Sequence, residues 1–137
     1  MIDREQIGEG PFTEEQEIYR ENILDHYKHP HHAGRLQNYT HHHRELNPLC
    51  GDELEVFLHV DHESLRDVGF VGKGCAISQA SMSMLADKIK NKSLQEIQAL
   101  TRHDILEMLG ISIGVVRMKC ALLGLLTVQK SLNGVSR

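Results

Sequence analysis

The sequence predicts an α+β domain, in which a small antiparallel sheet of about three strands packs against surrounding helices. Residues 53–71 alternate apolar and polar side chains, which is typical of strands with one buried face. The flanking segments carry apolar residues at helical spacing behind capping residues. With 137 residues, the chain fits one domain with its own core. We expect a flexible N-terminus over residues 1–12 and a single domain over residues 13–137.

The first helix is expected to begin after Thr13, because Thr13 and Gln16 have the spacing of a capping box. Tyr19, Ile23 and Tyr27 recur at every fourth position and predict its buried face. Pro30 should end the helix. Residues 31–48 are irregular and rich in histidine, which indicates a loop that could include an edge strand.

The next segment has the alternation expected of two strands joined by a turn. Apolar residues occupy every second position from 54 to 60, and the positions between them are expected on the opposite face: Glu53, Glu55, Phe57 and His59. Residues 61–64 form the predicted turn. A second strand follows over residues 66–71, with Val68 and Phe70 facing the core.

The C-terminal half is expected to be helical. Residues 72–74 break the second strand, and residues 75–90 predict a helix whose small residues suit close packing against the sheet. Ser93 and Thr101 each begin a capping-box pattern. Residues 116–132 predict a final, strongly apolar helix.

Composition argues against two classes of partner. A formal net charge of −4 and an isoelectric point near 6.2 leave no basic surface of the kind that binds nucleic acid. No apolar run approaches the roughly 18 residues of a membrane span, and the N-terminal segment is polar and acidic. We therefore expect a cytoplasmic protein that contacts neither nucleic acid nor membrane.

The three cysteines each lie at the boundary of a predicted element. An odd number of cysteines in a reducing compartment argues against a disulfide framework. Cys50 precedes the first strand, Cys75 opens a helix, and Cys120 lies in the first turns of the last helix, where the helix dipole favours a thiolate. Together with Asp52 they would supply three sulfur ligands and one oxygen ligand for tetrahedral zinc. The alternative is that they are buried core residues.

Four segments of the sequence resemble a known family. These are "LDHYKHPHHAG", "NPLCGDELEV", "GKGCAISQASMSML" and "RMKCALLGL", in that order. Together they are similar to the U-type iron–sulfur cluster assembly proteins, which include SufU, IscU and the N-terminal domain of NifU. The resemblance runs from about Tyr19 to Leu132 and implies a compact α+β domain whose three cysteines converge at one end.

The resemblance also implies roles for individual residues. Cys50 and Asp52 match the cysteine and aspartate of the family's NPxCGD element, Cys75 matches the cysteine of GxGC, and Cys120 matches the C-terminal cysteine. These four would bind zinc at rest, and the cysteines would bind a [2Fe–2S] cluster if the protein is a scaffold. Arg117 matches the arginine of the RxKC element. Its place one helical turn before Cys120 would let it stabilise an anionic persulfide, and the alternative is an ordinary surface salt bridge.

The implied function is to accept sulfane sulfur from a pyridoxal-phosphate cysteine desulfurase, for the benefit of apo iron–sulfur proteins. In a SufU-like relay, a sulfurtransferase-type role, Cys50 would accept the sulfur. In a non-enzymatic cluster scaffold, Cys120 would be the acceptor. Lys119 replaces the histidine of scaffold proteins, and their LPPVK segment is missing, which favours the SufU branch. The separation of 45 positions between Cys75 and Cys120 is closer to the scaffold spacing.

Other interpretations remain open from the sequence. A structural zinc domain that serves only as an interaction module would use the same ligands without accepting sulfur. A cysteine hydrolase ranks lowest, because no histidine lies in a motif that would position it beside a cysteine. His29, His31 and His32, with the triplet at residues 41–43, could form an accessory metal site, although a solvated histidine-rich loop is the favoured interpretation.

Overall fold

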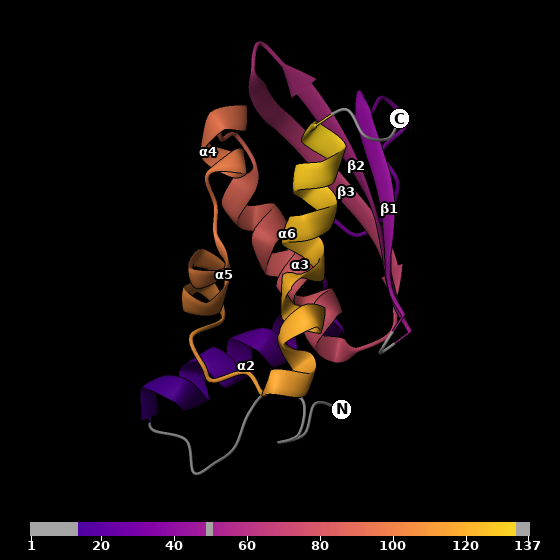
Figure 1. The fold of residues 1–137 in the computed structure, drawn as a ribbon. Coiled ribbons are helices and arrows are strands. Elements are labelled where there is room, and N and C mark those ends of the chain that lie inside the picture. Colours follow the sequence, from indigo (N-terminus) through magenta and orange to yellow (C-terminus); the bar gives the residue numbers. More distant parts are fainter. Residues whose placement is uncertain (1–13, 49–50, 134–137) are drawn as a thin grey trace.

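The computed structural model describes residues 14–48 and 51–133, and it has the predicted α+β class. A helix precedes three strands, and shorter and longer helices follow them (Figure 1). The elements are α2 (Glu14–Lys28), β1 (His41–Asn47), β2 (Asp52–Asp61), β3 (Ser64–Lys73), α3 (Ala76–Ile89), α4 (Leu94–Gln98), α5 (Arg102–Leu109), the 3₁₀ helix η1 (Val115–Arg117) and α6 (Met118–Leu132).

The sheet is antiparallel with the order β1-β2-β3, so the edge strand allowed for in the histidine-rich segment exists as β1. Asn47, the last residue of β1, pairs with Asp52, the first residue of β2. The β2–β3 connection turns through His62 and Glu63, whose φ angles of 53° and 64° are typical of a tight hairpin turn. The register therefore brings the β1–β2 connection and the end of β3 to one end of the sheet.

Helices α3 and α6 cover one face of the sheet and form the core with it (Figure 1). The inward residues of β2, including Leu54, Val56 and Leu58, have no exposed surface. The two helices approach closely at Gly124 of α6, where an added Cβ would lie 3.0 Å from the sulfur of Met82 on α3. Ser81, one of the small residues expected to pack against the sheet, instead donates a hydrogen bond of 2.8 Å to the carbonyl of Ala121 on α6.

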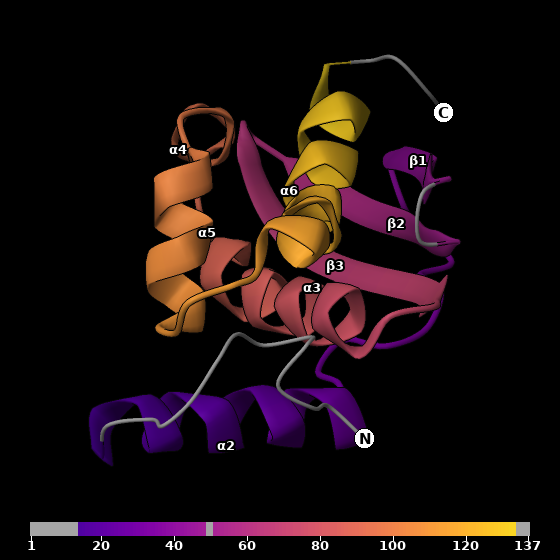
Figure 2. The same ribbon diagram turned by 60° about the horizontal axis from the view of Figure 1, so that its bottom comes forward.

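Helix α2 lies across the end of the molecule from which α6 starts (Figure 2). Ile23 is buried as predicted, but Tyr27 is 36% exposed and His26 is buried in its place. The prediction for Tyr27 was wrong because an α-helix has 3.6 residues per turn. Positions 19, 23 and 27 therefore drift around the helix, and the buried face continues at position 26.

The outer face of β2 is more buried than alternation predicted. Phe57, expected on the polar face, is 1% exposed. The segment after α2 folds back over this face, with the guanidinium of Arg35 5.1 Å from the centre of the Phe57 ring and the ring of Tyr39 5.4 Å away. His42 of β1 stacks on the same ring. Among the described residues, no helix is long and apolar enough to cross a bilayer.

Candidate metal centre

Two helix starts and one strand start meet at the end of the sheet that carries the β1–β2 connection (Figure 1). One ligand atom from each of Asp52, Cys75 and Cys120 lies within 4.8 Å of the other two. We call these three residues the cysteine centre. The structure therefore brings together, from three elements, three of the four residues predicted to bind metal.

Asp52 supplies the carboxylate of the cysteine centre and is completely buried. Its Oδ1 accepts a hydrogen bond of 2.6 Å from the backbone N–H of Cys75. Its other oxygen, Oδ2, has no hydrogen-bond partner among the described residues. A buried carboxylate oxygen without a partner is costly, so this atom is ready to bind a proton donor or a cation.

Cys75 is the N-cap residue of α3. Its extended backbone places Sγ where it accepts a hydrogen bond of 3.3 Å from the N–H of Ile77. Gly74 before it has a φ of 117°, and an added Cβ would collide with the backbone and carboxylate of Asp52. Only glycine lets the segment before Cys75 approach Asp52 so closely, which explains why a glycine precedes the cysteine in the GxGC pattern of this chain.

Cys120 is the third residue of α6 and is completely buried. The side-chain amide of Asn47 donates to its sulfur at 3.8 Å. Asn47 is 5% exposed and lies opposite Asp52 in the sheet. This contact was not predicted, because an asparagine before a proline is typical of a turn. Only the strand register places its side chain beside the centre.

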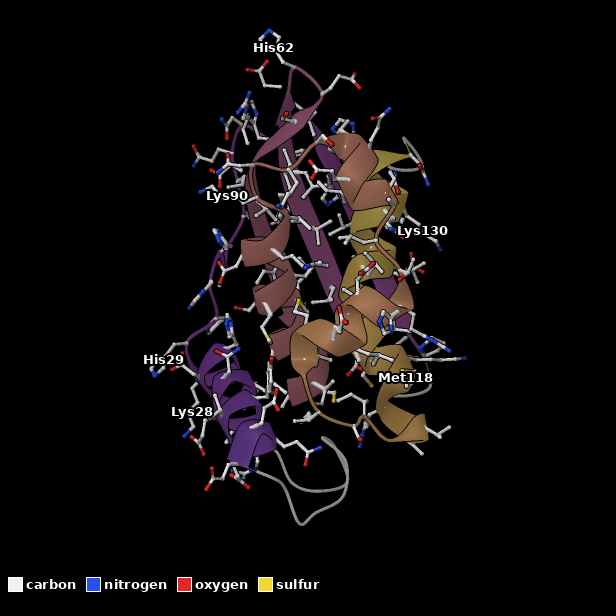
Figure 3. All side chains as sticks on the ribbon, turned by 90° about the vertical axis from the view of Figure 1, so that its left-hand side faces the viewer. Lys28, His29, His62, Lys90, Met118 and Lys130 are labelled. Carbon is white, nitrogen blue, oxygen red and sulfur yellow. The ribbon has the colours of Figure 1, made fainter. Side chains whose placement is uncertain are left out.

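Three further residues from the sequence predictions remain to be placed: Cys50, Arg117 and Lys119. Cys50 lies outside the described residues. Arg117 ends the 3₁₀ helix η1, is partly buried, and lies one turn before Cys120. Lys119 is exposed. In Figure 3, the label at Met118 marks where α6 begins, between Arg117 and Cys120 in sequence.

The donor atoms suit a tetrahedral cation. Sulfur ligands bind zinc at about 2.3 Å, which places two such ligands about 3.8 Å apart. The three donor atoms lie within 4.8 Å of one another, so small side-chain adjustments would bring them to ligand distance. Two sulfurs and one carboxylate oxygen leave one position for a further ligand.

Comparison with known proteins gives the chain a family context. The family model described as the NifU-like N-terminal domain matches residues 18–135. The zinc-dependent sulfurtransferase SufU of Bacillus subtilis is 31% identical over 130 residues, which covers 82% of this chain and 88% of that protein. The iron–sulfur cluster assembly scaffold protein IscU of Streptococcus pyogenes is 39% identical over 83 residues, or 61% of this chain and 52% of that protein.

A solved structure from Fervidobacterium islandicum, assigned to the SUF iron–sulfur assembly system, has the same fold. It aligns with a TM-score of 0.69 and 30% identity, covering 85% of this chain and 98% of that chain. The matches span both the SufU and the IscU names.

Proposed function

Because the chain belongs to the NifU-like N-terminal domain family, we propose that it is an iron–sulfur cluster assembly protein that accepts sulfane sulfur from a cysteine desulfurase. The acceptor site is the cysteine centre together with Cys50. The observation that carries the proposal is the buried Oδ2 of Asp52, which has no partner among the described residues and lies beside two cysteines. A protein that needed these cysteines only for packing would have no reason to bury a carboxylate among them.

In the resting protein, Cys50, Asp52, Cys75 and Cys120 hold zinc. Bound zinc keeps the thiols deprotonated, which is the form that ligation and sulfur transfer both require. The N–H of Ile77 and the side-chain amide of Asn47 donate to the sulfurs of Cys75 and Cys120, and these contacts orient the two ligands.

Sulfur transfer is an attack by a thiolate on the terminal sulfur of the desulfurase persulfide. A new S–S bond forms on the acceptor, the old one breaks, and the desulfurase cysteine leaves as a thiolate. Cys75 and Cys120 belong to helix starts that are packed into the core. In the sequence, Cys50 stands between Pro48 and Gly51, a composition typical of loops. A cysteine in a loop can leave a metal without unpacking a helix, so Cys50 is the proposed acceptor.

Two further side chains support this role. Arg117 lies one turn before Cys120 and carries the positive charge that would stabilise an anionic persulfide. Asp52 is a hard ligand beside soft thiolates, so it exchanges more readily than they do and lets the centre open.

A second candidate function is a cluster scaffold, in which a [2Fe–2S] cluster is the cargo passed to apo-proteins. The IscU relatives and the spacing of Cys75 and Cys120 favour it. In that case Cys120 is the acceptor. The exposed Lys119, where scaffold proteins carry a histidine, favours the relay.

Mass spectrometry separates these functions. The zinc-loaded protein is incubated with a cysteine desulfurase, pyridoxal phosphate and cysteine, and peptides are mapped for an added sulfur. The relay predicts the label on Cys50 and its loss in Cys50→Ser, while Cys120→Ser does not move it. Label on Cys120 that survives Cys50→Ser would assign the chain to the scaffold. No label on any cysteine of the folded, zinc-loaded protein would leave only a structural zinc module.

A further inference from the structure

A second group of metal-binding side chains lies on the other half of α3, away from the cysteine centre. His26 comes from the last turn of α2, His31 from the segment that follows, and Asp87 from α3. One ligand atom of each lies within 4.8 Å of the other two, and the centres of the two imidazole rings are 4.4 Å apart. We call these three residues the histidine cluster. Figure 3 labels Lys28 and His29, which lie between His26 and His31 in the sequence.

Ser83 of α3 holds both histidines in place. Its Oγ accepts a hydrogen bond of 2.7 Å from the backbone N–H of His31 and lies 2.7 Å from Nδ1 of His26. Ser83 is completely buried, and His26 is 6% exposed. One buried hydroxyl thus orients the ring of His26 and the backbone that carries His31, as outer partners do in metal sites.

The carboxylate of Asp87 is held by two histidines. Its Oδ2 lies 2.5 Å from Nδ1 of His31, and its Oδ1 lies 2.9 Å from Nε2 of His32. His32 has a φ of 62° and is anchored to β3, since its carbonyl accepts from the N–H of Phe70 at 3.1 Å. The histidine segment is therefore fixed on both sides, by α3 and by the sheet edge.

The charge states of these groups suit ligation near neutral pH. Burial, followed by the nearby His31, lowers the pKa of His26, which keeps the imidazole neutral with a free lone pair. Burial works to raise the pKa of Asp87, but hydrogen bonds with His31 and His32 outweigh it and leave the pKa lowered. A neutral imidazole and an ionised carboxylate are the forms that bind metal.

We propose that His26, His31 and Asp87 form a second metal site, which takes a divalent first-row transition cation such as Zn²⁺ or Co²⁺. Two imidazoles and one carboxylate suit these cations, whereas Ca²⁺ and Mg²⁺ favour all-oxygen sites. The cation replaces the proton shared by His31 and Asp87, and water completes its coordination. A surface depression lined by Asn22, His26, Met84 and Asp87 connects the site to solvent.

The site is separate from the cysteine centre. Cys75 and Asp87 are 12 positions apart across α3, which corresponds to about 18 Å along the helix axis. One cation cannot use both groups. The proposal therefore does not depend on sulfur transfer, and it can be tested without a desulfurase.

The test is a titration of full-length, zinc-loaded protein with Co²⁺, followed by the histidine ring signals in NMR spectra. We expect one further equivalent to bind and to broaden the signals of His26 and His31. Asp87→Asn and His31→Gln should each weaken this binding by about 10-fold or more, as loss of a ligand exceeds the effect of losing an outer partner. Visible spectra should lack the thiolate charge-transfer bands of cobalt bound to cysteine.

His103→Gln is the matched control. His103 and Glu107 also form a histidine–carboxylate pair, at 3.4 Å, but both are exposed, and the part of the chain that the structure describes supplies no third ligand to the pair. This variant should bind Co²⁺ as the wild type does. The proposal is overturned if both Asp87→Asn and His31→Gln retain wild-type affinity, if His103→Gln loses as much, or if His26 is unaffected by the cation. If Asp87→Asn fails to fold, His31→Gln alone decides. The side chain of His31 is 46% exposed, so its replacement should not disturb the fold.

Discussion

The cysteine centre and the histidine cluster both use α3, but they differ in how far the protein itself satisfies their ligand atoms. Asp52 is completely buried, and its Oδ2 has no partner among the described residues. Asp87 is partly exposed, and each of its oxygens is paired with a histidine. Without a cation, the Asp52 carboxylate has an oxygen that no described residue satisfies, whereas both oxygens of Asp87 already have histidine partners.

This difference sets how tightly each site should bind metal. At the cysteine centre, a cation relieves an unsatisfied buried charge and gains thiolate ligands. At the histidine cluster, a cation must displace a proton from an existing hydrogen bond and gains no thiolate ligand, so binding is weaker. Metal at the cysteine centre should therefore contribute to stability, and metal at the histidine cluster should exchange readily.

The largest expected effect comes from removing the metal. At a free zinc concentration 1,000 times the dissociation constant, binding stabilises the fold by about 4 kcal/mol. A strong chelator should therefore lower the melting temperature of the wild type markedly. Cys120→Ser should melt low with or without chelator, whereas His31→Gln should keep the full chelator response. If the wild type melts at the same temperature with and without chelator, metal at the cysteine centre does not contribute to stability.

The next effect concerns the ligand role of Asp52. Asp52→Ala should weaken zinc binding by about 10-fold or more without unfolding the protein, because the thiolates remain. Asp61→Ala is the control, since Asp61 ends the same strand β2 but is exposed. Competition with a coloured chelator measures both affinities. If the two variants bind zinc equally well, Asp52 is only a cap for the N–H of Cys75.

Gly74→Ala tests the close approach that shapes the cysteine centre. A left-handed backbone costs a non-glycine residue about 1–2 kcal/mol, and here the new Cβ also collides with Asp52. Gly51→Ala is the matched control, because Gly51 has a φ of 74° but no contact of an added Cβ within 4 Å among the described residues. We expect Gly74→Ala to lower the free energy of unfolding more than Gly51→Ala does, in denaturant titrations without metal. Equal losses would show that Asp52 can move aside.

The smallest effect is a pH dependence that belongs to the histidine cluster. His26 has a pKa below its ordinary 6.5 in the folded state, so below that pH the unfolded chain binds more protons. The stabilisation is complete above pH 6.5 and is lost as the pH falls from there toward the lowered folded-state pKa. His26→Gln should flatten this slope in metal-free protein, and His103→Gln should not. An unchanged slope in His26→Gln would assign the pH dependence to other groups.

Much of the fold could be predicted because its causes are local. The capping boxes at Ser93 and Thr101 are present as predicted, with both reciprocal hydrogen bonds in each. The alternation along β2 and β3 correctly places Val68 and Phe70 in the core. Each of these features depends on residues only a few positions apart, whose spacing the sequence states directly.

The candidate sites were predictable to different degrees. The family motifs pointed to Asp52, Cys75 and Cys120 together, although 23 positions separate Asp52 from Cys75. The donor role of Asn47 and the pairing of His31 with Asp87, 56 positions away, were not predicted. The first placement depends on strand register, and the second depends on how α2 and the segment after it lie against α3.

The sequence alone thus determined where α4 and α5 begin and that β2 and β3 have a buried face, because caps and apolar periodicity act within a few residues. Only the tertiary structure decided that Asp52 is buried with one oxygen that no described residue satisfies, that Phe57 is covered, and that His26 lies near Asp87. These features arise where elements pack against one another, and packing depends on the shapes of distant surfaces. A local pattern carries no information about such contacts.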